Sequence, residues 1–221
     1  MAFKYSSVTK KIIMALAGLF LISFLIVHLS INLLLLFDGS GDSFNIAAHF
    51  MATNPVIQVM QLVLFGGFIL HILVGIILQT QNWLARPTRY KVEGFSHTSF
   101  FSKFMIHTGA VILAFLVIHL FDFFFKAKFG ELHEVMIDDT LMEDMGVLVI
   151  EKFKDFPYVL MYVVWLLFLG FHLDHAFHSA LQSLGLNHSK YTPLAFGLSR
   201  ALAILIAGGF ILIPVIIYIT Q

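Results

Sequence analysis

The segment Ile12–Phe37, IIMALAGLFLISFLIVHLSINLLLLF, contains 26 consecutive residues without a charged side chain. A helix crosses the hydrocarbon core of a bilayer with about 20 mainly apolar residues. The apolar part of a signal peptide is shorter, at about 7–15 residues, and precedes a cleavage site of the A-x-A type. No such site followed by a soluble domain is found here, so we expect Ile12–Phe37 to be a retained transmembrane helix.

The rest of the chain has the same character. Of the 221 residues, 59% are hydrophobic and 12% are charged, whereas soluble domains carry about 25% charged residues. The one long connection, 126–156, is acidic and is expected to be a surface loop or a short amphipathic helix. We predict an all-α integral membrane protein that forms one domain, 1–221, with five transmembrane helices at about 12–37, 56–82, 104–125, 157–184 and 194–220.

Lysine and arginine residues predict the orientation of these spans. Loops rich in Lys and Arg face the cytoplasm, and with five spans the N-terminus shares a side with the second-to-third and fourth-to-fifth loops. The opposite side has only four such residues, set among acidic ones between Asp38 and Asp155. We therefore expect a bacterial inner-membrane protein with a cytoplasmic N-terminus; the basic residues of that side are Lys4, Lys10, Lys11, Arg86, Arg89, Lys91, Lys103, Lys190 and Arg200.

Composition also limits the chemistry. The chain has no cysteine, which excludes disulfides, thiolate catalysis, iron–sulfur clusters and covalent c-type haem attachment within it. Its formal net charge is zero, so nothing indicates a nucleic-acid partner. Eleven histidines are the obvious reserve of metal ligands.

Four histidines lie well inside four different spans. At 1.5 Å per residue, His28 and His119 lie about 5–7 Å past the span centre toward the non-cytoplasmic side, and His71 and His172 about 3 Å toward the cytoplasmic side. The four thus form two pairs at two depths, as two bis-histidine sites in a four-helix bundle require. A single membrane histidine is more often an interhelical hydrogen-bond partner, but this pattern favours metal ligation.

The donor set favours haem over zinc. Zinc usually takes four protein ligands, or three and an open position, whereas each pair offers two imidazoles without Cys, Asp or Glu at the same depth. We therefore predict two six-coordinate b haems in a bundle of the first four helices. Glycines within three turns of the ligands would let a porphyrin approach the helix backbone; they are Gly18, Gly67, Gly75 and Gly109.

The segment FHLDHAFH, 171–178, leaves open which histidine is the ligand. His172 is the deepest, but His175 could replace it on geometry alone, and His178 approaches the membrane edge. Asp174 could orient a ligand, belong to a proton path or satisfy a neighbouring helix. His107 is expected to be interfacial.

Five segments together resemble a known family: GLFLISFLIVHLSIN (18–32), FNIAAHFM (44–51), LHILVG (70–75), TGAVILAFLVIHL (108–120) and FHLDHAFHSALQSLG (171–185). They are similar to the five-helix, dihaem cytochrome b membrane subunit of succinate dehydrogenase and fumarate reductase. The resemblance covers nearly the whole chain, and a ten-residue interval separates glycine from histidine in the first and third spans. Two departures are Ala176, where the family has glycine, and Gly170, where some fumarate-reducing relatives have a glutamate that serves a proton path.

The resemblance implies the roles of the residues. His28 and His119 would bind the distal haem, and His71 and His172 the proximal haem. The chain would anchor a flavoprotein subunit and an iron–sulfur subunit on the cytoplasmic face, against the segments 83–103 and 186–200. It would pass electrons between the iron–sulfur subunit and membrane quinone, as the quinone-reactive subunit of a succinate:quinone oxidoreductase whose dicarboxylate chemistry lies on the partners.

The resemblance favours menaquinone, which composition does not distinguish from ubiquinone, and the quinone is expected near the distal haem at the outer ends of the first two spans. Asn32, Asn45, His49 and Gln58 are the candidate residues there. Each could equally act as a helix cap or in a loop hydrogen bond.

Two other functions remain open from the sequence. A dihaem cytochrome b of a hydrogenase or formate dehydrogenase would dock its partner on the opposite face. A non-redox transporter could use the histidines as a proton relay, although the inverted repeats common in transporters are not visible in the sequence.

Overall fold

Five long helices form the molecule in a computed structural model that describes residues 7–85, 104–186, 188 and 190–221. All five are long and apolar enough to cross a membrane, so the predicted number of spans is confirmed. Their observed limits are Val8–Leu36, Pro55–Leu84, Met105–Phe129, Phe156–Ser183 and Thr192–Thr220, close to the ranges predicted from hydropathy.

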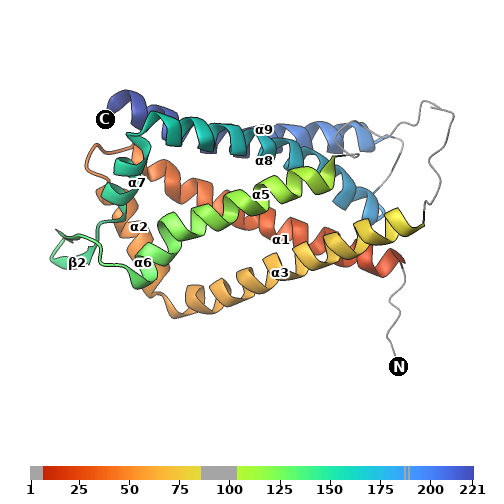
Figure 1. Ribbon diagram of the computed structural model, residues 1–221, viewed down its shortest axis with the longest axis horizontal. Helices are drawn as coiled ribbons and strands as arrows, with labels where there is room; N and C mark the ends of the chain where they lie inside the picture. The colour runs from red at the N-terminus through yellow and green to blue at the C-terminus, as the bar shows by residue number, and fades with distance from the viewer. Residues whose placement is uncertain (1–6, 86–103, 187, 189) are drawn as a thin grey trace.

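The spans alternate in direction along the long axis of the molecule (Figure 1). The first consists of α1 (Ser7–Leu33) and the short 3₁₀ helix η1 (Leu34–Leu36), and the second is α3 (Pro55–Leu84). The third begins as α5 (Met105–His119), passes through a π-helical turn, η2 (Leu120–Phe124), and ends as α6 (Phe125–Phe129). The last two spans are α8 (Phe156–Ser183) and α9 (Thr192–Thr220).

The packing is uneven across the bundle. The helix α8 packs along α9 and also contacts α1 and α5, and α1 in turn contacts α3 and α9. Apolar side chains of α1, α8 and α9, among them Ile22, Leu173 and Ile206, form a core between these helices. Within the described residues, α3 has no buried side chain. Many of its leucines, isoleucines and valines are exposed, among them Leu62, Ile69 and Leu73, as is expected of a helix whose solvent is lipid.

Short elements close one end of the bundle. The helix α2 (Asp42–Thr53) precedes α3, and the segment after α6 forms a hairpin of β1 (Glu134–Ile137) and β2 (Thr140–Glu143), followed by α7 (Met145–Phe153). The hairpin turns at Asp138 and Asp139, both with positive φ, as type I′ turns require. The segment 126–156, expected to be a loop or a short helix, thus contains the β1–β2 hairpin followed by the helix α7.

Helix α2 carries His49, one of the candidate quinone residues. The Asp38 side chain accepts hydrogen bonds from the backbone N–H groups of Gly41 and Ser43, at 2.7 and 2.9 Å. These bonds satisfy donors at the start of α2, which have no partner within the helix. The hydrogen bonds from Ser43 hold the pKa of Asp38 below its usual value.

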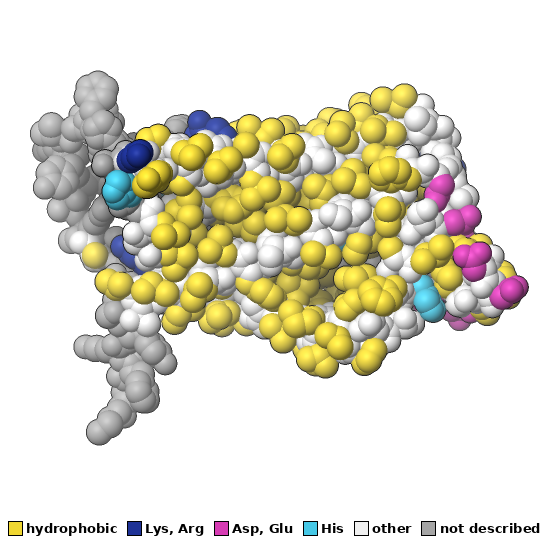
Figure 2. Space-filling model, turned by 180° about the vertical axis from the view of Figure 1, so that it is seen from behind, with side chains coloured by type: hydrophobic (Ala, Val, Ile, Leu, Met, Phe, Trp, Pro, Cys, Tyr) yellow, Lys and Arg dark blue, Asp and Glu magenta, His cyan; other side chains and the backbone are white. Residues whose placement is uncertain are grey.

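Charge separates the two ends of the bundle (Figure 2). The end at which α1 begins carries Lys10, Lys11 and Arg200, and we call it the basic end. The opposite end, which holds α2, the hairpin and α7, displays most of the acidic side chains, and we call it the acidic end. Five further basic residues of the predicted cytoplasmic side, Lys4, Arg86, Arg89, Lys91 and Lys103, lie outside the described residues.

Candidate functional site

His28 and His119 approach each other across the bundle, nearer the acidic end. Their ring centroids are 5.8 Å apart and their planes are nearly perpendicular, at 83°. Aromatic rings surround both: Phe24 stacks on His28 at 5.3 Å, and Phe115 and Phe123 lie 5.6 and 5.3 Å from His119. We call these two histidines the outer pair.

His71 and His172 form a second pair toward the basic end. Their ring centroids are 6.3 Å apart and their planes meet at 69°. We call them the inner pair. The pairs that the depths in the sequence predict are therefore the pairs that lie close in the structure, whereas their role as haem ligands stays a prediction.

The separation within each pair suits two imidazoles on opposite sides of one metal ion. Imidazole nitrogens bind such ions at about 2.0–2.1 Å, which places the ring centres about 6 Å apart. Among the described residues, no group of three or more His, Asp and Glu side chains gathers as a metal site. Each pair brings two imidazoles together, the donor set that a bis-histidine haem would use.

Three of the four rings have a polar neighbour at Nδ1. The hydroxyl of Tyr162 lies 3.4 Å from His119 Nδ1, and that of Thr108 lies 3.3 Å from His172 Nδ1. The amide nitrogen of Asn32 lies 3.3 Å from His28 Nδ1. Metal-binding histidines commonly use one nitrogen for the ion and the other for such a neighbour, so Nε2 is the nitrogen left for a metal in His119 and His172.

The fourth ring, His71, differs. Its Nδ1 is buried and has no hydrogen-bond partner among the described residues, a condition that native structures rarely leave unexplained. Gly18 lies beside this ring: a Cβ added there would be 3.7 Å from His71 Cε1. An orphaned imidazole nitrogen beside a bare backbone is consistent with a prosthetic group at the inner pair.

Gly109 has the corresponding place beside His172, since its added Cβ would lie 3.7 Å from His172 Cε1. The other two predicted glycines have different neighbours. A Cβ on Gly67 would meet the Phe20 ring at 3.0 Å, and one on Gly75 would meet Met14 Cε at 3.4 Å. Only Gly18 and Gly109 therefore open space next to the paired histidines.

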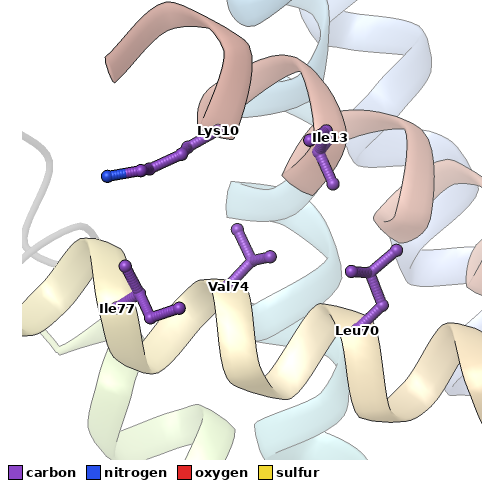
Figure 3. A pocket seen from close by; sticks show the side chains of 5 residues that line it. All are labelled: Lys10, Ile13, Leu70, Val74 and Ile77. Carbon is purple, nitrogen blue, oxygen red and sulfur yellow. The ribbon is translucent and has the colours of Figure 1, made fainter. Parts of the chain in front are cut away.

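An apolar groove lies between α1 and α3 (Figure 3). It has a volume of about 330 Å³ and is lined by Ile13, Leu70, Val74, Ile77 and one cation, Lys10. Leu70 and Val74 come from the same turns of α3 as His71. Among the five residues that line this groove, Lys10 alone is charged, and its ammonium group could pair with a carboxylate.

The polar residues of 171–178 have structural partners. Arg200 of α9 donates from Nε and Nη2 to the Asp174 carboxylate, at 3.2 and 3.4 Å, which links α8 to α9. The His178 ring packs on Phe196 at 4.2 Å and its Nε2 lies 4.0 Å from Asp174. The carboxylate is therefore engaged in a helix–helix contact, and within this segment only His172 faces another histidine at ring-contact distance.

Gly170, two residues before His172, lies against α9. A Cβ at this position would be 3.1 Å from Ala207 Cβ. The close approach of α8 and α9 explains why a small residue is present. His107 lies at the start of α5, exposed and 5.8 Å from the Phe104 ring, in agreement with an interfacial position.

The four candidate quinone residues have different environments. Asn32 lies next to His28, as described, and also donates to its backbone carbonyl at 2.8 Å. Gln58 donates to the Ala52 carbonyl at 2.9 Å, and His49 is partly exposed on α2.

Asn45 is fully enclosed, with 1% of its surface exposed. It donates to Asp144 Oδ1 at 2.9 Å and accepts from the Gly146 backbone N–H at 2.7 Å. The side chain thus joins α2 to the start of α7, and we leave it out of the proposed quinone site.

Replacing Asn45 by alanine is expected to lower the free energy of unfolding by about 1–3 kcal/mol. The change leaves the Gly146 N–H and one Asp144 oxygen without this partner in an enclosed site, and that is the usual cost of such a loss. Thermal unfolding of the purified protein in detergent measures it, with Gln58→Ala as the control that should stay near wild type. A stable Asn45→Ala variant with impaired quinone binding would instead return Asn45 to the quinone site.

Sequence reasoning missed two neighbours of the paired histidines, Thr108 and Tyr162. Thr108 precedes Gly109 in the chain, and Tyr162 lies ten residues before His172. Neither spacing distinguishes a side chain that faces a histidine from one that faces lipid.

Comparisons of the chain with protein-family models, with curated proteins and with solved structures found no match.

Proposed function

We propose that the chain is the dihaem cytochrome b anchor of a succinate:quinone oxidoreductase, the function that its five motifs favour. The observation that carries the proposal is the convergence of four histidines, one from each of α1, α3, α5 and α8, into two close pairs at two levels of the bundle. Two such pairs along one bundle are what electron transfer across part of a membrane requires.

The residues fit haem b at both levels. His28 and His119 would hold one group, and His71 and His172 the other; bound haem supplies reversible one-electron transfer. The protein holds the imidazoles of His172 and His119 in place through the Nδ1 contacts of Thr108 and Tyr162. Phenylalanine rings around the outer pair exclude water.

The proposed orientation places the basic end in the cytoplasm of a bacterium, because loops rich in Lys and Arg stay on that side. The flavoprotein and iron–sulfur subunits would dock there, against 186–200 and against 83–103, which lies mostly outside the described residues. Menaquinone would react near the outer pair at the acidic end, where Asn32, His49 and Gln58 are the remaining candidate residues.

The test is a haem count on the detergent-purified chain, by the pyridine haemochrome method against protein concentration. We expect two b haems per chain. One haem would show that only one pair binds. None, in folded protein supplied with haem, would overturn the proposal and favour a transporter with a histidine relay.

Partner identity needs a second measurement. Co-purification with a succinate-oxidising flavoprotein and an iron–sulfur subunit would support the proposal. A hydrogenase or formate dehydrogenase partner, bound at the acidic end, would replace it with another dihaem cytochrome b function.

A further inference from the structure

A continuous series of polar side chains connects His119 to the acidic end. The Tyr162 hydroxyl lies 3.4 Å from His119 Nδ1, and the hydroxyls of Tyr162 and Tyr158 are 3.1 Å apart. Tyr158 donates to Asp122 Oδ2 at 2.8 Å, and Lys152 donates to Asp122 Oδ1 at 2.6 Å. We call Tyr162, Tyr158, Asp122 and Lys152 the tyrosine chain.

Three elements contribute residues to the tyrosine chain. Tyr158 and Tyr162 lie one turn apart on α8, so their hydroxyls point the same way. Lys152 comes from α7. Asp122 lies in the π-helical turn η2 that directly follows His119, and such turns often occur at functional sites.

The chemistry of these groups fixes the direction of the hydrogen bonds. An ionised carboxylate only accepts, and each tyrosine has one hydrogen to donate. Tyr158 has one hydrogen and two acceptors within reach, Asp122 Oδ2 at 2.8 Å and the Tyr162 hydroxyl at 3.1 Å. We assign its hydrogen to the closer, charged carboxylate, so the contact between the two hydroxyls uses the hydrogen of Tyr162. A lone pair of Tyr162 then faces His119, which pairs with a proton on His119 Nδ1.

We propose that the tyrosine chain is a positioning device that holds the proton on His119 Nδ1 and turns Nε2 toward His28. This inference rests on the proposed function, because Nε2 is the nitrogen that would bind the outer haem. Through the two hydroxyls, the negative Asp122 polarises the imidazole and makes it a stronger electron donor. A stronger donor stabilises the oxidised metal, so the tyrosine chain lowers the midpoint potential of the outer haem.

The inner pair has no comparable connection among the described residues. Thr108 faces His172 Nδ1, but its own hydroxyl donates to the Met105 backbone carbonyl at 2.9 Å. The hydrogen bonds from His172 therefore lead through Thr108 to a neutral backbone carbonyl and not to a charged side chain. A change in the tyrosine chain should therefore affect one haem and leave the other as an internal reference.

The experiment is a redox titration of the purified two-haem protein and of its Tyr162→Phe and Tyr158→Phe variants. We expect each variant to retain two haems and to raise the midpoint potential of one of them, more for Tyr162→Phe because it removes the direct contact. The low-spin ferric EPR signal of the same haem should shift. Tyr218→Phe is the matched control, since Tyr218 packs on Phe156 at 5.5 Å, away from the histidines, and should change neither potential.

The outcomes separate this inference from the proposed function. Wild-type protein that binds no haem contradicts the proposed function. A second outcome is wild-type protein with two haems and Tyr162→Phe and Tyr158→Phe variants whose midpoint potentials match wild type. That outcome overturns the role of the tyrosine chain and leaves the proposed function in place. If Tyr162→Phe loses a haem, the midpoint potential of Tyr158→Phe decides whether the tyrosine chain acts on the haem. This variant breaks the link to Asp122 and leaves the Tyr162 hydroxyl beside His119.

Discussion

In the proposed dihaem protein, replacing His28 by alanine is expected to reduce the haem content from two per chain to one. Replacing His119 should remove the same haem, because a six-coordinate site loses its group when one of two imidazoles is gone. The measurement is the pyridine haemochrome count, combined with the midpoint potential of the haem that remains. That potential identifies which pair is still loaded.

Double variants test the pairing itself. Because His28 and His119 face each other at 5.8 Å, His28→Ala/His119→Ala should still bind one haem. His28→Ala/His71→Ala takes one ligand from each pair and should bind none. The control is His107→Ala, which removes an exposed histidine from the same helix as His119 and should keep both haems. A His28→Ala/His119→Ala variant without haem would contradict independent pairs.

Replacing Gly109 by leucine is expected to remove the haem of the inner pair and leave that of the outer pair. A Cβ at Gly109 lies 3.7 Å from the His172 ring, an ordinary contact, but the larger branched end of leucine extends into the space beside the imidazole. Leucine forms helix better than glycine by roughly 0.5–1 kcal/mol, so the change should not unfold α5. Haem content and the potential of the remaining haem provide the measurement.

Two variants complete the design. Gly109→Ala adds only the Cβ and should retain both haems. Gly66→Leu places the same side chain where a Cβ meets no atom within 4 Å, so it controls for an added leucine in a helix. Two haems in Gly109→Leu would contradict the prediction and show that the inner haem does not occupy the space beside Gly109.

The spans were predictable from the sequence because a bilayer demands long runs of apolar residues. Every predicted span has a matching helix, with limits that differ by one to four residues at most ends. The depths of the four histidines were equally accessible, because the rise per residue of a helix is fixed. Depth alone was enough to choose the two pairs, since two levels and alternating directions leave one partner for each ring.

The surroundings of the pairs were not predictable in the same way. Asn45 was a reasonable quinone candidate by position, yet it joins α2 to α7 across about a hundred residues of sequence. Asp174 could have served a proton path, but it pairs with Arg200 of the next helix. Both outcomes depend on which face each helix turns toward its neighbour.

The sequence by itself determined that this protein is a five-span helical membrane protein with two levels of histidines. Length, hydropathy and helical rise are local properties, and each can be read from one segment at a time. Only the tertiary structure decided which polar groups meet the histidines, among them Thr108, Gly109 and the tyrosine chain. Those contacts depend on the rotation of whole helices and on a π-helical turn after His119, which arise from the packing of distant segments against one another.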